Sequence, residues 1–389
     1  MQLEEKVEII RSRGLLGEWE GLFLDWQRDR GLPRDDIEFL ARRVRMVPLY
    51  GRIPDRFVEF GDSMGEPKYE RVLHIPDQRA RDVLIEDIDI QGDTEFASVE
   101  QQVHLLGQPP SEMDYKHALI LMAQEMRHGV QMCDVLLNHF GESGRRYAER
   151  LLERNALEDT RRLGAFNGEV RNWLGFWLYT AFQDRDGKYQ LVMWWHSAFA
   201  PMGASMSPML QEEGFHIFVG LSGLCRITEA NVVPRSLIQR YINEIFPKVL
   251  DLFGGDYSSM AEWRYVWGLK GRYDENQHRP ASKNEKEDLN GHNRRLFIHE
   301  CQTQVIDKMN AHVKDPEEKL FLPSEKFNRH MGQYKEAHYD IFGEPMADSR
   351  WDAYLKQVLP NDDTDAEFAS LTKEEGWITP AWKSSYDRD

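Results

Sequence analysis

The sequence predicts an all-α protein, with a four-helix bundle as its core, extra peripheral helices, and irregular N- and C-terminal segments. The first reason is that four long segments dominate residues 77–230, and each is bounded by residues that begin or end helices. The second is that apolar and acidic residues share one helical stripe, as Leu84, Ile88 and Glu95 do. The third is that the pattern stays helical beyond this region.

The four core segments are expected at 77–106, 111–140, 169–199 and 207–230. The first stops at the sequence Gly-Gln-Pro-Pro, and the third ends before a proline. Ser111 is expected to cap the second segment and Gly141 to end it. Ser207 is expected to cap the fourth, with Pro208 at the first helical position, where its missing N–H has no partner to lose.

The remainder of the chain is expected to surround this core. Further helices are predicted at 33–47, 234–253, 258–270 and 292–312. The stretch 274–290 is polar and contains proline, so we expect an exposed loop there. The rest of the first seventy residues reads as short irregular pieces, with strands among the options, and the acidic last forty are expected to cover the surface. No clean boundary is visible, so we expect a single domain, 1–389, in which the core, 77–230, carries a peripheral helical extension, 231–389.

Composition excludes several classes of function. The chain has 389 residues, of which 41% are hydrophobic, enough for a large core. The net charge of −17 argues against a nucleic-acid or anionic-membrane partner, since both need a basic surface. The three cysteines, Cys133, Cys225 and Cys301, are far apart, which excludes a disulfide scaffold and an internal iron–sulfur cluster. With no signal peptide and no apolar run long enough to span a membrane, a cytoplasmic protein is expected.

Three Glu-x-x-His motifs carry the chemical signal. The spacing places a carboxylate and an imidazole on the same helix face, one turn apart, where both can bind one metal ion. The motifs lie at 125–128, 213–216 and 275–278. The third occurs in a polar stretch, and we interpret it as a chance match on a solvated loop. The other two lie within apolar segments, where a charged pair needs a partner.

Each of these two motifs follows a lone carboxylate on the preceding helix. Glu95 lies 30 residues before Glu125, and Asp184 lies 29 residues before Glu213. Ferritin-like di-iron bundles use this pattern, with one carboxylate from each of two helices and one Glu-x-x-His from each of the other two. Four carboxylates and two histidines can bind and neutralise two divalent metals. Such ligands suit iron or manganese, and the lack of thiolates argues against structural zinc.

Simpler interpretations of single residues stay open at this level. Glu125 with His128 can be an exposed ion pair, and His216 can be a core histidine satisfied by hydrogen bonds. Asp184 belongs to the string QDRDGKYQ, which could be a turn in which it or Asp186 caps a helix. The duplicated spacing favours the metal site, and aromatic patterns on both sides of the string favour one continuous helix with Asp184 facing inward.

Further acidic residues are candidates for orienting the metal ligands. Metal-bound histidines usually donate their second ring nitrogen to a carboxylate or carbonyl. Asp93, Asp134 and Glu212 are candidate acceptors, although a surface charge or a helix cap is the simpler interpretation of each. The sequence alone does not choose among them.

Several long strings resemble one known family in chain order. They are QGDTEFASVEQQ (91–102), EMRH (125–128), LGAFN (163–167), QDRDGKYQL (183–191), QEEGFHIFVG (211–220) and GLKGR (268–272). Together they resemble benzoyl-CoA 2,3-epoxidase, the oxygenase component of aerobic benzoyl-CoA degradation. The resemblance covers more than half of the chain.

This resemblance implies a di-iron centre, with a manganese–iron pair as the alternative. The implied ligands are Glu95, Glu125, His128, Asp184, Glu213 and His216. The implied reaction inserts one oxygen atom from O₂ into the aromatic ring of an aryl-CoA thioester. Electrons would come from a separate NADPH-dependent flavin and iron–sulfur reductase. A homodimer is an option that the sequence leaves open.

The chain departs from the family pattern at two positions next to the motifs. Phe215 replaces a family histidine, and Gln124 replaces a family glutamate, so the substrate is left in doubt. Coenzyme A phosphates would need cations. The candidates for these contacts are Lys270 and Arg272 of the GLKGR string, and Arg279 and Lys283 beyond it. A solvated helix end and loop would explain these four residues equally well.

Two rival functions use the same motifs. One is a paralogous di-metal oxygenase or oxidase that acts on a different aromatic substrate. The other is a non-enzymatic ferritin-like protein that stores metal or serves as a scaffold. The duplicated motif does not separate these three functions, and only the family strings favour the aryl-CoA oxygenase.

Overall fold

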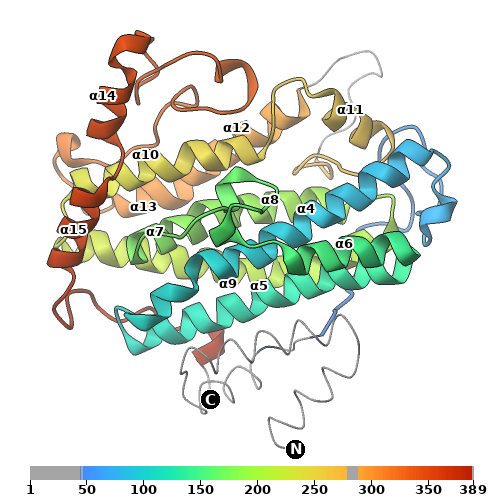
Figure 1. The fold of residues 1–389 in the computed structure, drawn as a ribbon, viewed down its shortest axis with the longest axis horizontal. Helices are drawn as coiled ribbons and strands as arrows, with labels where there is room; N and C mark the ends of the chain where they lie inside the picture. The colour runs from blue at the N-terminus through green and yellow to red at the C-terminus, as the bar shows by residue number, and fades with distance from the viewer. Residues whose placement is uncertain (1–43, 45–46, 278–287, 388–389) are drawn as a thin grey trace, which may run out of the picture.

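The computed structural model describes residues 44, 47–277 and 288–387, and this part of the chain is mainly helical (Figure 1). Within it, strand pairing is confined to isolated bridges, such as the one between Phe57 and Pro67. The predicted all-α class is therefore confirmed. The helix expected at 33–47 lies almost wholly outside the described residues.

The core is a bundle of long helices that run side by side in Figure 1. Helix α4 packs on α5, helix α8 packs on α9, and α5 and α9 bring the two pairs together. Helix α7 continues the line of α8 and also packs on α9. The bounds are α4 Gln78–Gln102, α5 Glu112–His139, α7 Trp173–Leu178, α8 Asp184–Trp195 and α9 Ala200–Ala230.

The first helix pair follows the predicted capping. The Asp77 side chain accepts a hydrogen bond from the backbone of α4, and the Ser111 side chain does so for α5. A short 3₁₀ turn, Val103–Gly107, carries α4 to the predicted stop. Gly141 has a φ of 57°, a left-handed conformation that favours glycine, and it ends α5 as predicted. A helix that we did not predict, α6 (Gly141–Glu153), starts directly there and packs back on α4 and α5.

The third core segment differs from the continuous helix predicted at 169–199. It begins at Trp173, because the Asn172 side chain caps the helix by accepting from Gly175 N–H. A π-helical turn, Tyr179–Gln183, then separates α7 from α8. A π turn holds one more residue than an α turn, so it rotates every residue that follows about the helix axis.

The fourth core helix starts earlier than predicted. Helix α9 begins at Ala200, and Pro208 lies inside it, so the predicted cap at Ser207 is wrong. A proline inside a helix leaves the carbonyl four residues earlier without a donor. Here the backbone N–H of Gly51 donates to that Ala204 carbonyl at 2.8 Å. Only glycine permits this approach, since a Cβ at Gly51 would lie 2.7 Å from Ser207 Oγ.

The later helices pack around one side of the bundle (Figure 1). Their bounds are α10 Arg235–Leu252, α11 Ser259–Val266, α12 Leu289–Cys301, α13 Asp307–Met309, α14 Asp348–Val358 and α15 Asp362–Leu371. The first three lie near predicted positions, but α11 ends early because the chain turns at Gly268, where φ is 70°. Helices α14 and α15 were not predicted, and both lie at the edge of the molecule.

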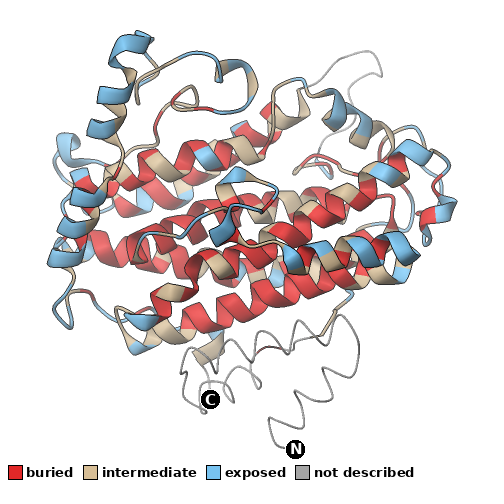
Figure 2. Cartoon of the chain, viewed as in Figure 1, coloured by how far each residue is buried: buried red, intermediate tan, exposed pale blue. Residues whose placement is uncertain are grey.

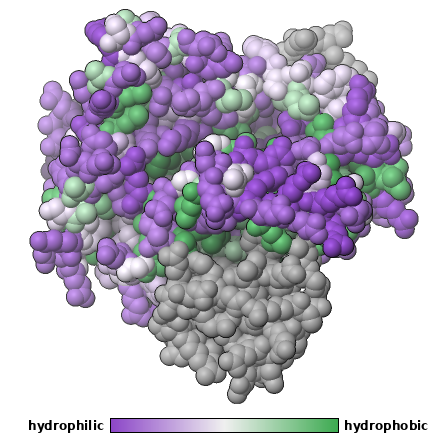
Figure 3. Space-filling model, in the orientation of Figure 1, coloured by the Kyte–Doolittle hydropathy of each residue, from purple (hydrophilic) through white to green (hydrophobic). Residues whose placement is uncertain are grey.

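Burial follows this arrangement. Buried residues run along the centre of the bundle, and exposed ones concentrate on its outer helices and loops (Figure 2). One apolar cluster joins the bundle helices to α10 and α12. The face drawn in Figure 3 is largely hydrophilic, with apolar residues in small separate patches. Within the described part of the chain, every helix is too short or too polar to cross a membrane.

Candidate metal centre

The six predicted ligands meet at the middle of the bundle. Helices α4 and α8 each supply one carboxylate, and α5 and α9 each supply a glutamate and a histidine. Every one of these side chains is buried, in residues with at most 7% of their surface exposed. They are Glu95, Glu125, His128, Asp184, Glu213 and His216. The interpretation of the first motif as an exposed ion pair is therefore wrong.

One half of the cluster surrounds His128. Its Nδ1 atom lies 3.2 Å from Glu95 Oε2 and 3.7 Å from Glu213 Oε1. With Glu125, these residues form a group whose ligand atoms all lie within 4.8 Å of one another. One nitrogen and three carboxylates around a small space form a typical donor set for a divalent metal.

The other half surrounds His216. Its Nδ1 atom lies 3.0 Å from Glu125 Oε1, 3.4 Å from Glu213 Oε2 and 4.0 Å from Asp184 Oδ2. Glu125 and Glu213 thus face both histidines, whereas Glu95 and Asp184 each lie in one half. The two imidazole rings are 5.8 Å apart, centroid to centroid. This arrangement of four carboxylates around two histidines suits two divalent metal ions.

The charges and hydrogen bonds of the cluster fit bound cations. Asp184 Oδ2 and Glu213 Oε2 are buried and have no hydrogen-bond partner among the described residues. Buried polar atoms without partners are rare and costly. Four carboxylates also outnumber two histidines, so positive charge is missing from the protein side. Two divalent cations would satisfy the orphaned atoms and the charge together.

The shifted pKa values of the cluster residues also fit a site for bound cations. Burial, and then the charge of Glu95, raise the pKa of Glu125 to about 8. Burial, and then Glu125, raise the pKa of Asp184 well above its usual value. Burial opposes the charged form of His128, yet the neighbouring Glu95 and Glu212 raise its pKa to about 9. The protein therefore holds protons at positions where metal ions would displace them.

The far side of His128 is held by a charged pair. Its Nε2 atom lies 2.8 Å from Glu212 Oε2, and Glu212 in turn accepts from Arg127 Nε at 3.0 Å. The guanidinium is fully buried, and its partners hold the pKa of Glu212 at about 2, against the opposing effect of burial. One of the three candidate acceptors is thus found beside a predicted ligand, and Glu212 is not a surface charge.

The far side of His216 is held by a neutral chain. Its Nε2 atom lies 3.1 Å from Gln124 Oε1, and Gln124 Nε2 donates to the Tyr386 hydroxyl at 2.7 Å. Gln124 and Glu212 each precede a motif glutamate, and each contacts the histidine of the opposite motif. The sequence signal for both was this position, but nothing in the sequence indicated Tyr386.

The other two candidate acceptors bind elsewhere. Asp93 pairs with Arg154 and Arg161, each at 3.1 Å. Asp134 accepts from Tyr50 and from Asn138. Neither aspartate contacts a cluster histidine, so neither of these two candidates is an acceptor. A further partner of the cluster, Gln91, was missed. Its Nε2 atom donates to Glu95 Oε1 at 2.7 Å, one turn along α4.

The π turn decides which aspartate faces the cluster. Asp184 follows the turn directly and joins Glu125 and His216 within 4.8 Å. Asp186 points away and accepts from Gln190 at 2.8 Å, one turn further along α8. The alternative of a surface turn at these aspartates is wrong, because both are buried inside a helix.

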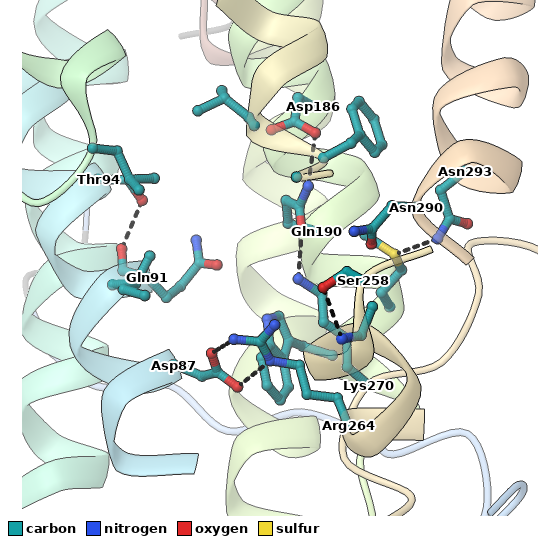
Figure 4. Close-up of a pocket in the computed structure, with 18 of the residues that line it drawn as sticks. Asp87, Gln91, Thr94, Asp186, Gln190, Ser258, Arg264, Lys270, Asn290 and Asn293 are labelled. Atoms are coloured by element: carbon teal, nitrogen blue, oxygen red, sulfur yellow. Dashed lines mark hydrogen bonds and ion pairs between the residues drawn. The ribbon is translucent and has the colours of Figure 1, made fainter. Parts of the chain in front are cut away.

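A cavity of about 310 Å³ lies beside the cluster (Figure 4). Its walls come from α4, α8, α11, α12 and the segment after α10. Gly187 is where the cavity approaches the carboxylates: a Cβ there would lie 3.9 Å from both Glu213 oxygens. Gln183, beside Asp184, also lines it. The cavity therefore reaches the cluster from the α4–α8 side.

The predicted cationic residues have different surroundings. Lys270 lines the cavity and donates to Gln190 Oε1 at 2.6 Å. Arg272 is buried, and Glu275 accepts a hydrogen bond from its backbone N–H at 2.8 Å. The alternative of a solvated loop is thus wrong for Arg272, and Glu275 of the third motif is buried as well. His278, Arg279 and Lys283 lie outside the described residues.

Phe215 and Lys270 line different hollows. Its ring packs 4.7 Å from that of Tyr386. It lines a second hollow with Phe218 and the C-terminal segment around Ser384. Phe215 is absent from the lining of the cavity at Gly187. Any effect of this departure on that cavity would therefore be indirect.

Comparison with known proteins adds one similarity. No family model matches the chain. The chain is similar to benzoyl-CoA oxygenase component B of Aromatoleum evansii, with 30% identity over an alignment of 412 positions. This alignment covers 89% of the chain and 86% of the relative. Most of the length of both proteins takes part in the similarity.

Proposed function

Because this chain belongs to the benzoyl-CoA oxygenase component B family, we propose that it is a di-iron monooxygenase that inserts one oxygen atom from O₂ into the aromatic ring of an aryl-CoA thioester. The observation that carries the proposal is the buried cluster of four carboxylates and two histidines, arranged in two overlapping groups. Two of its buried carboxylate oxygens, on Asp184 and Glu213, have no hydrogen-bond partner among the described residues. Such a cluster is costly unless it binds cations.

The donor set supports iron, with a manganese–iron pair as the alternative. Glu95 and His128 would hold one ion and Asp184 and His216 the other, and Glu125 and Glu213, which face both histidines, would complete the ligands of the pair. Oxygen and imidazole ligands suit these metals better than zinc. When bound, the two irons supply the redox chemistry with O₂ that amino-acid side chains lack.

The protein's own residues would bind and orient the ring. The cavity beside the cluster has apolar walls that include Ile90, Phe166, Trp194 and Phe253. These side chains would exclude water and hold an aromatic group against the carboxylate side at Gly187. Hydrogen bonds from Gln91 to Glu95, and from His128 to Glu212, would hold the ligands in place for the ions.

A separate protein would supply the electrons. Insertion of one oxygen atom, with the other released as water, needs two electrons and two protons. The three cysteines of the chain are far apart in sequence, and the sequence contains no nucleotide-binding glycine motif. The relative is named component B, which supports a multicomponent system. We propose an NADPH-dependent reductase with flavin and iron–sulfur centres as the partner.

Iron content tests the centre directly. The purified protein is loaded with Fe(II) without oxygen, and bound iron is counted per chain. We expect about two irons, and a loss of most of them when Glu125→Ala and His216→Ala are combined. His104→Ala, outside the cluster, is the matched control. Iron content well below two that does not change in the double variant would refute the centre.

Product mass tests the reaction. The iron-loaded protein is supplied with benzoyl-CoA, O₂ and a reductase or chemical reductant. A gain of one oxygen atom in the thioester, labelled from ¹⁸O₂, is expected. Oxygen consumption without such a product would favour an oxidase. No substrate-coupled oxygen consumption at all would favour a metal-storage protein.

A further inference from the structure

The cavity beside the cluster has a positively charged group in its wall. Lys270 lies after α11, and its ammonium nitrogen donates to Gln190 Oε1 at 2.6 Å (Figure 4). The same nitrogen lies 5.1 Å from the centre of the Trp194 ring. Both neighbours belong to α8, the helix that also supplies Asp184. The ammonium group is therefore held against one wall of the cavity.

Lys270 has more donors than the protein satisfies. An ammonium group has three N–H donors, and Gln190 is its hydrogen-bond acceptor among the described residues. The residue is half-buried, because its end opens into the cavity. Burial, and then the charge of Arg264, lower its pKa to about 8. An enclosed cation with free donors is a group that a ligand acceptor would stabilise.

The neighbouring charges restrict which acceptor fits. Arg264 is neutralised by Asp87, whose oxygen lies 2.8 Å from its Nε. Asp186 binds the other end of Gln190 at 2.8 Å. With two carboxylates around the lysine and one paired arginine, a doubly charged phosphate would meet repulsion. A neutral carbonyl oxygen would accept from Lys270 without this cost.

Two residues of α8, Gly187 and Gln190, mark the two ends of the part of the cavity that a ligand would occupy. Gly187 lines the cavity, and a Cβ built on it would lie 3.9 Å from the Glu213 oxygens. Lys270 donates to Gln190, which lies three residues further along α8. That separation is a rise of about 4.5 Å along the helix. Ile90 of α4 and Phe253 after α10 line the same cavity with apolar surface. The cavity, of about 310 Å³, thus has room for one aromatic ring beside Gly187 and Lys270.

We propose that Lys270 donates a hydrogen bond to the carbonyl oxygen of the aryl thioester and thereby sets how deeply the ring enters the cavity. This inference rests on the proposed function. It makes Lys270 a substrate-binding residue that recognises an aroyl group, rather than a contact of the coenzyme A phosphates. A ring attached to sulfur without a carbonyl would lose this contact.

Equilibrium binding to two ligands tests the inference without turnover. Benzoyl-CoA is compared with S-benzyl-CoA, which has a methylene in place of the carbonyl, by calorimetry on the iron-loaded protein without oxygen. The wild type should prefer benzoyl-CoA by about tenfold or more, as expected for a hydrogen bond from a charged donor. Lys270→Met should reduce this preference to less than about threefold and leave the affinity for S-benzyl-CoA unchanged.

Lys248→Met is the matched control, since this lysine is exposed on α10 and its ion pair within the described part of the chain is with Glu244. It should retain the full preference. If Lys270→Met lowered the affinities for both ligands equally, Lys270 would be a contact of the coenzyme A part, and the inference would be overturned. A wild type that binds both ligands equally would overturn it even if the variant did not fold. Binding of neither ligand by the wild type would instead refute the proposed function, and the inference with it.

Discussion

At the residue scale, the two histidines of the cluster differ in what holds them. His128 contacts the charged Glu212, which pairs with buried Arg127, whereas His216 contacts the neutral Gln124. A carboxylate acceptor makes an imidazole a stronger ligand than an amide does. The two metal positions are therefore expected to have unequal affinities, with tighter binding at His128.

Replacing the charged acceptor should reveal this difference. Glu212→Gln removes the carboxylate that orients His128 and leaves Arg127 without its counter-charge. We expect the affinity for one of the two Fe(II) ions to fall about 10- to 100-fold. Competition with a chromophoric chelator measures this affinity. Glu142→Gln, on the exposed face of α6, is the control and should bind both ions as the wild type does. Unchanged binding in Glu212→Gln would contradict the assigned role.

The protonated carboxylates predict how the metal-free protein responds to pH. The pKa of Glu125 is raised to about 8 and that of His128 to about 9, so the folded state binds protons that the unfolded state releases. Stability from Glu125 is complete below about pH 4.5 and is lost as pH rises to about 8; His128 acts with the same sign between about 6.5 and 9.

Urea unfolding of the metal-free protein between pH 5 and 8 measures this dependence. We expect the unfolding free energy to fall by ~2 kcal/mol or more across this range. Glu125→Gln, which stays neutral, should flatten the slope. Bound Fe(II) should reverse the trend, because the metal replaces the protons. Equal slopes in the wild type and in Glu125→Gln would show that this carboxyl does not titrate as described.

At the element scale, two helix irregularities place the site. The π turn before α8 directs Asp184 to the cluster and Asp186 to the cavity wall. The proline inside α9 is accommodated because Gly51 supplies the donor that the helix lacks. In the first case a local departure from α geometry accompanies the choice of the side chain that faces the cluster, and in the second it is accommodated by a contact from outside the helix.

The contact at Gly51 can be tested by a single methyl group. In Gly51→Ala the new Cβ would lie 2.7 Å from Ser207 Oγ, so the loop must move away from α9 and the Ala204 carbonyl loses its donor. We expect the unfolding free energy to fall by about 1–3 kcal/mol. Thermal or urea denaturation measures this change. Gly107→Ala, which meets no atom within 4 Å, is the control. A variant as stable as this control would show that the contact is unimportant.

At the scale of the whole molecule, the C-terminal segment returns to the centre of the bundle. Tyr386 accepts from Gln124 and packs on Phe215, and the carbonyl of Thr379 accepts from buried Arg226. Residues more than 250 positions apart in sequence thus share one hydrogen-bonded chain that ends at His216. The end of the chain thus packs against residues of α5 and α9.

Removing the tyrosine hydroxyl should loosen this chain. Tyr386→Phe deprives Gln124 of its acceptor, at a cost of about 1 kcal/mol, and leaves His216 less firmly oriented. We expect a three- to tenfold loss of affinity for a single Fe(II), measured by chelator competition, and the ion affected should differ from that in Glu212→Gln. Tyr257→Phe changes an exposed residue and serves as the control. Full affinity for both ions would exclude a role for the hydroxyl.

The sequence by itself determined the helical class, most of the core helices and five of the six residues that meet at the centre. The reason is that these depend on short-range regularities: caps, apolar spacing, and a Glu-x-x-His motif whose two side chains share one face of any helix. The same regularity, repeated about thirty residues after a lone carboxylate, was enough to relate four helices.

Only the tertiary structure decided the features that depend on distant partners. Without the family resemblance, Asp184 could be chosen over Asp186 only once the π turn was known. The start of α9 before Pro208 could be explained only by the donor from Gly51. The roles of Gln124 and Tyr386, and the position of Lys270 in a cavity wall, needed helices brought together from across the chain. The local sequence carries no signal for such contacts, because they are made by packing between elements and not by local propensity.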